Sequence, residues 1–246
     1  MSNEFYEPLI ERDLEAIPAA ARAFAAEHSI DELYLAVARF GVLAYAPSMH
    51  SKRAVMACRA AHDVREVMGE RWLDLVIECA RYVAEARQPW SEPPILTDVA
   101  LPSREELERD AGDDALLIID TAFALIPILG EKGKAMLLRM PQLELENPQT
   151  RSPLEPLEVV VDRAIASKGA IEDVTRVLVC GAAGFSPPEK PGGLKPAAPP
   201  VYYLARDFAQ TLIAFSRPPD YRRDEFLAAV KHNLEHGEDF SAWSLA

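Results

Sequence analysis

The chain has 246 residues, of which 49% are hydrophobic, and its formal net charge at pH 7 is -13. An acidic surface repels phosphate backbones, so the composition argues against nucleic-acid binding. No apolar run is long enough to span a bilayer and the first residues lack an apolar signal core, so we expect a cytoplasmic protein with no membrane partner. The three cysteines are isolated in the sequence, which disfavours a disulfide framework and excludes a cysteine-rich zinc site.

The first half of the chain has the apolar spacing of amphipathic helices. Ser29 and Glu32 form a capping box that begins a helix over about 30–45. Ser51 is placed to cap the next helix, which Gly69 ends. A third helix follows over 70–88, with a polar stripe (Arg71, Asp74, Glu78, Arg81, Glu85) that we expect to face solvent.

A second capping box, Ser103 with Glu106, precedes the segment "DDALLIIDTAFALIPILG". This segment is apolar on nearly all sides, which predicts a central, buried helix that Pro127 kinks or ends. Residues 141–152 are predicted to be a polar connector, and 186–200 a proline-rich loop of extended character. Two further helices are expected between that loop and residue 237.

Two segments resemble each other across the chain: "IDELYLAVARFGVLAYAPS" at 30–48 and "IEDVTRVLVCGAAGFSPPE" at 171–189. By itself the second is similar to the strand-and-turn fingerprint of dinucleotide-binding dehydrogenases. In those dehydrogenases the fingerprint is followed directly by a helix. Here it is followed by "SPPEKPGG", whose prolines disfavour a helix. We therefore interpret the similarity of the two segments as the result of a duplication of a three-helix unit.

These observations predict an all-α fold of about eight to ten helices in a single domain, residues 1–246. Two similar three-helix halves, about 29–90 and 170–237, would lie around the central apolar helix near Asp120.

The segments "RAVMACRAAH" and "GERWLDLVIECARYV" carry a family resemblance. They resemble a bacterial all-α family that is itself similar to the questin-oxidase-like proteins, whose better-known members are metal-dependent oxygenases of aromatic polyketides. The resemblance implies a histidine at each end of this helix and a third in the second half. His62 fits the second of these positions, whereas Arg53 stands at the first and Pro200 or Val201 at the third. Arginine stays protonated and does not ligate metals, so the resemblance implies an iron site that is degenerate in this chain.

Two residues are candidates for catalysis. His62 lies at the edge of an apolar stripe and would be a ligand or general base facing a cavity, unless its ring simply finds local partners. Asp120 is an acid within an apolar helix and must be paired or protonated. Its structural interpretation is an arginine partner, Arg59 or Arg206; its functional one is a metal ligand or proton carrier.

The candidate ligand-binding residues carry charge or an aromatic ring on otherwise apolar helices. They are Arg53, Arg59, Arg206, Asp207 and Tyr202. His232 and His236 have the i, i+4 spacing of a metal-binding pair, but we expect them to face solvent near a helix end.

Two classes of function remain open from the sequence. The first is a small-molecule-binding protein, or a tailoring enzyme of secondary metabolism related to oxygenases, with its pocket between the halves. The second is a non-catalytic interaction or scaffold protein that uses its proline-rich loop or a helix groove. A ligand pocket favours the first class, and an exposed apolar groove favours the second.

Overall fold

The computed structural model describes residues 4–86, 101–146, 228, 231 and 232, and these residues form helices and no strand. The helices are α1 (Tyr6–Glu11), α2 (Ile17–Glu27), α3 (Ile30–Leu43), α4 (Met49–Asp63), α5 (Arg65–Met68), the 3₁₀ turn η1 (Gly69–Arg71), α6 (Trp72–Ala86), α7 (Arg104–Glu108), α8 (Asp113–Leu129) and α9 (Glu131–Glu146). The all-α fold class is therefore confirmed for this part of the chain. The predicted second half, 170–237, lies outside the described residues apart from three positions, so the duplication stays a prediction.

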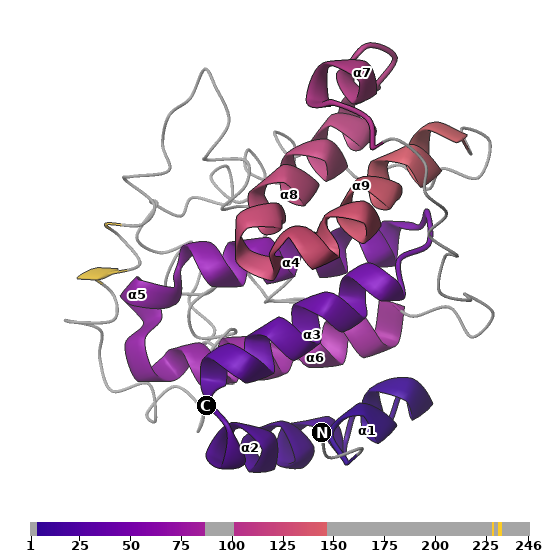
Figure 1. Cartoon of the computed structure of the whole chain (residues 1–246). Helices are drawn as coiled ribbons and strands as arrows, with labels where there is room; N and C mark the ends of the chain where they lie inside the picture. The colour runs from indigo at the N-terminus through magenta and orange to yellow at the C-terminus, as the bar shows by residue number, and fades with distance from the viewer. Residues whose placement is uncertain (1–3, 87–100, 147–227, 229–230, 233–246) are drawn as a thin grey trace, which may run out of the picture.

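The helices pack in three layers (Figure 1). A central layer of α3, α4 and α6 is covered on one side by α1 and α2 and on the other by the α8–α9 hairpin. α7 packs against α8. The three helices of the first predicted unit, α3, α4 and α6, thus contact one another directly.

Serine caps set where several helices begin. Ser29 Oγ accepts the backbone N–H of Glu32 at 3.1 Å. Ser103 and Glu106 form a complete capping box, with each side chain bonded to the other residue's backbone N–H. The predicted cap of α4 is wrong by one turn: Ser48 Oγ, not Ser51, caps this helix by accepting the N–H of Ser51 at 3.2 Å. These side chains satisfy backbone donors that a helix leaves unpaired at its first turn.

Glycines in the left-handed region turn the chain at two helix ends. Gly69, with φ of 55°, follows α5, and Gly130, with φ of 79°, ends α8. Pro127 lies in the last turn of α8, so the helix ends two residues after the proline. The start of the polar connector predicted at 141–152 is wrong, because α9 continues through Pro141 to Glu146.

The most enclosed helix is α6 rather than α8. α6 contacts α1, α2, α3 and α4, and even Glu78 of its expected polar stripe is buried, with 6% of its surface exposed. On α8 the residues Ile118, Ala122 and Leu125 are buried, but Pro127 is exposed. The expected solvent face of α6 is thus wrong at Glu78, whereas the side chains of Asp74 and Arg81 keep 32% and 21% of their surface exposed.

No described helix is long and apolar enough to cross a membrane.

Candidate functional site

A pocket of about 540 Å³ opens where the end of α4 meets the start of α3 and the last turns of α8. Its volume lies within the range of small-molecule sites in proteins. The lining comes from the four helices α3, α4, α5 and α8, and consists of Asp31, Tyr34, Leu35, His62, Asp63, Arg65, Ala124, Pro127 and Ile128.

The two walls of this pocket differ in polarity. Ala124, Pro127 and Ile128 line one wall at i, i+3 and i+4, the spacing of one helix face. The end of α4 contributes the imidazole of His62 and the carboxylate of Asp63 to the lining. The pocket can therefore hold a molecule with an apolar face and a hydrogen-bonding edge.

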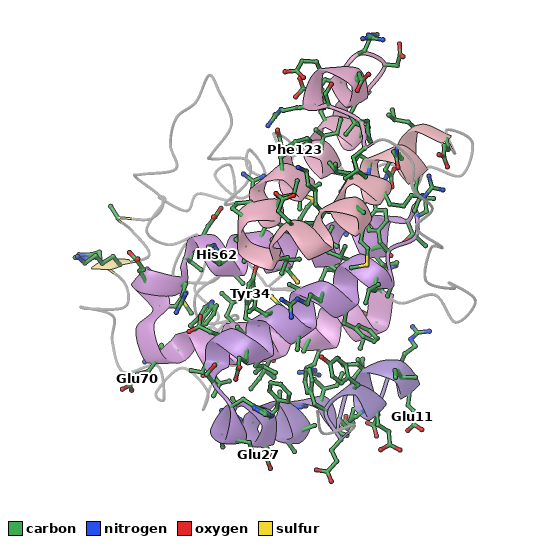
Figure 2. All side chains as sticks on the ribbon, in the orientation of Figure 1. Glu11, Glu27, Tyr34, His62, Glu70 and Phe123 are labelled. Carbon is green, nitrogen blue, oxygen red and sulfur yellow. The ribbon has the colours of Figure 1, made fainter. Side chains whose placement is uncertain are left out.

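Tyr34 packs against His62. Figure 2 shows the two labelled side chains next to each other between α3 and α4, and their ring centroids lie 5.7 Å apart. The other aromatic neighbour of Tyr34 is Trp72, at 5.4 Å, and the Trp72 indole N–H donates to the carbonyl of Ala61 at 2.8 Å. A row of three rings thus holds the end of α4 against α3 and α6.

The Tyr34 hydroxyl is a buried donor. It donates to the backbone carbonyl of Cys58 at 2.9 Å. Burial, followed by the nearby Cys58, Cys79 and Asp63, raises the pKa of Tyr34 well above its usual value. The phenol therefore stays neutral at physiological pH.

Two ion pairs order the rim. Arg65 bonds Asp31 at 2.6 Å, and its guanidinium carbon lies 4.9 Å from the centroid of the Trp72 ring. Arg59 Nε lies 3.9 Å from the Asp63 carboxylate. Each acid of the rim is thus matched by an arginine, so these two pairs add no net charge to the rim.

Of the residues expected to act together, the structure places only His62 on the pocket. Arg59 reaches it indirectly, through its pair with Asp63. Arg53 is buried, with 8% exposed, more than two helical turns before His62, and it does not line the pocket. The remaining candidates, Arg206, Asp207 and Tyr202, lie outside the described residues, as do the proline-rich loop 186–200 and the segment 171–189.

Asp120 differs from its expected environment. Its side chain is 33% exposed, because α8 has one face outside the core. An arginine partner is present, but it is Arg104 on α7 and not Arg59. The same guanidinium bonds Glu108 at 2.6 Å and lies over the ring of Phe123. Asp120 therefore joins α7 to α8, one turn before the pocket residue Ala124.

Two features of the structure could not be predicted from the sequence. Tyr34 was hidden as one more member of an apolar helical stripe, although a tyrosine at a buried position signals a hydroxyl that needs a partner. The second feature is a buried ionic cluster at α4 and α9: Lys52 Nζ lies 3.0 Å from Glu144 Oε2, and the Tyr45 hydroxyl donates to Glu144 Oε1 at 2.5 Å. Nothing in the local pattern pairs Lys52 with a glutamate so distant in sequence.

Within the part of the chain that the structure describes, no three histidine, cysteine, aspartate or glutamate side chains are grouped to hold a metal ion. His232 is helical and exposed, which agrees with its expected place on a solvent face.

Comparisons of the chain with family models, with curated proteins and with solved structures found no match. The resemblance to questin-oxidase-like proteins thus remains a hypothesis from the sequence.

Proposed function

We propose that this protein binds a small amphipathic molecule in the pocket between α3, α4, α5 and α8. The observation that carries the proposal is the mixed lining: an apolar face of α8 together with His62 and Asp63 of α4. Ligand sites in proteins combine apolar walls with a few placed polar groups, as this lining does.

His62 is the residue of this pocket with the widest chemical range. A neutral imidazole both donates and accepts, and its contact with the Tyr34 ring holds it at the pocket wall. In this proposal His62 hydrogen-bonds the polar edge of the ligand. The apolar part of the ligand then lies against Ala124 and Ile128.

Ligand binding can be tested with 8-anilinonaphthalene-1-sulfonate (ANS), an amphipathic aromatic probe. Isothermal titration should give one site per chain. The variant Ala124→Trp fills the pocket from α8 and should abolish that site. Ala26→Trp, at an exposed position of α2, is the matched control and should bind ANS like the wild type. Equal binding by both variants, or no binding by the wild type, would overturn the proposal.

A catalytic role as a tailoring oxygenase, which the family resemblance implies, would need a metal in addition. Elemental mass spectrometry of the purified protein tests this separately. One iron per chain that is lost in His62→Ala supports the oxygenase. Metal content that is unchanged in His62→Ala argues against a site at this residue, without affecting the ANS result.

A further inference from the structure

Cys58 and Cys79 face each other across the interface between α4 and α6. The two helices run antiparallel, as two hydrogen bonds show: Ser51 Oγ donates to the carbonyl of Ala86 at 3.3 Å, and Trp72 Nε1 donates to that of Ala61 at 2.8 Å. Cys58 comes seven residues after Ser51, and Cys79 seven residues before Ala86. Seven residues are about two helical turns, so both cysteines lie on the contact faces and at the same level.

The two thiols interact with each other. Hydrogen bonding from Cys58, together with burial, raises the pKa of the Cys79 thiol. Both residues are almost completely buried, at 1% and 0% exposure, and both are free thiols. An isolated buried cysteine acts as a small apolar residue, but two thiols in contact can also join.

We propose that Cys58 and Cys79 are a modification site, at which a peroxide converts the dithiol into a disulfide that links α4 to α6. The reaction takes place when α4 and α6 separate transiently, which admits peroxide and lets one thiol lose its proton. That thiolate attacks an oxygen of hydrogen peroxide; the O–O bond breaks and hydroxide leaves. The second sulfur then attacks the resulting sulfenic acid, its proton and the hydroxyl leave as water, and the S–S bond forms. In total the two thiols lose two electrons and two protons, and one peroxide becomes two waters.

The disulfide would be coupled to the pocket. The carbonyl of Cys58 accepts the hydrogen bond of Tyr34, which lines the pocket, and His62 lies one turn further along α4. Drawing α4 toward α6 moves this carbonyl, and with it Tyr34 and the ring of His62. This coupling rests on the proposed ligand site, whereas formation of the disulfide does not.

The experiment uses the full chain with Cys180→Ser, so that only two thiols remain. The folded protein is incubated with hydrogen peroxide, quenched in acid, and analysed by intact mass and by peptide mapping. The expected result is the loss of both thiols, a mass lower by two hydrogen atoms, and a peptide that joins Cys58 to Cys79. Thiols that both remain alkylatable after denaturation, or that gain oxygen instead of pairing, would overturn the proposal.

A control variant and a binding readout complete the test. With Cys58→Ala added, the remaining thiol should form no intrachain disulfide, while circular dichroism confirms that the helices persist. ANS affinity measured before oxidation, after oxidation and after dithiothreitol should change and then return. A disulfide that forms without any change in ANS affinity refutes the coupling to the pocket, and absence of ANS binding in all states refutes the ligand site but not the disulfide.

Discussion

The buried ion pair between α4 and α9 gives a sharp prediction about stability. The perturbation is Glu144→Gln, which keeps the shape of the side chain and removes its charge. Both Lys52 and Glu144 have side chains that are 0% exposed, and their charged atoms lie 3.0 Å apart. The substitution therefore removes the countercharge from a lysine that water does not reach.

The magnitude follows from this geometry. Removing one partner of a buried ion pair costs about 3–5 kcal/mol, because the other charge stays in a medium that solvates it poorly. In a chain of this size each kcal/mol lowers the melting temperature by roughly 2–4 °C, so the expected fall is roughly 6–20 °C. The amide oxygen of glutamine can still accept the Tyr45 hydroxyl, which isolates the effect of the charge.

Thermal and urea unfolding followed by circular dichroism measure this effect. Glu131→Gln is the matched control on the same helix, since its pair with Lys134 is 79% and 36% exposed and contributes at most about 1 kcal/mol. The double variant Lys52→Met with Glu144→Met removes both charges and should recover most of the lost stability. The reasoning is refuted if Glu144→Gln unfolds within about 1 kcal/mol of the wild type, or if the double variant is as unstable as the sum of its singles.

Three further predictions concern α3, α6 and α7. Burial raises the pKa of Glu78 from 4.5 to about 7 despite Arg81, so the folded state holds the proton more tightly than the unfolded state. The free energy of unfolding should therefore fall as the pH rises from about 4.5 to 7. Glu78→Gln should flatten this pH dependence, measured by urea unfolding at each pH. A flat wild-type profile over that window would contradict the assignment. Gly41→Ala places a Cβ 3.0 Å from Val83 Cγ2 and should destabilise by about 1–3 kcal/mol, whereas the control Gly133→Ala meets its nearest atom at 3.4 Å and should be neutral or stabilising. Melting temperatures that fall equally in both variants would exclude close packing as the cause. Ser103→Ala removes the capping box and should cost about 1 kcal/mol, seen as faster amide exchange in α7; unchanged exchange there would show that the cap is dispensable.

The helices and several of their ends could be predicted from the sequence because their causes are local. Ser29 and the pair Ser103–Glu106 cap their helices through atoms three residues away, and apolar spacing reports a buried face wherever that face is continuous. The misplaced cap at Ser51 has a local cause as well. Ser48 precedes it by one turn, and a serine at either place reads as a cap.

The degree to which each helix is covered could not be predicted, because it depends on tertiary packing. In the sequence Glu78 belongs to a polar stripe, which predicts exposure to solvent, yet the residue is buried and α1 and α2 pack against α6. Asp120 reads as a buried acid, yet its face of α8 is partly exposed and Arg104 reaches it from α7.

The candidate site also combines residues that local patterns indicate with residues that only tertiary packing brings together. The sequence proposes His62 because a histidine stands at the edge of an apolar stripe, and the structure places it on the lining of the pocket. Tyr34 and Ile128 were missed because only the packing of α3 and α8 around the end of α4 brings them to the same space. Sequence spacing alone carries no information on which helices meet.

Methyl NMR during titration with ANS tests the central claim, a ligand site between α3, α4, α5 and α8, most directly. The account predicts that the methyl resonances of Leu35 and Ile128, which line the pocket, shift with a single dissociation constant. Those of Leu9 and Ile17, buried in α1 and α2 at 0% exposure, should stay in place. Shifts centred on α1 and α2, or spread evenly over the methyl groups, would contradict the account.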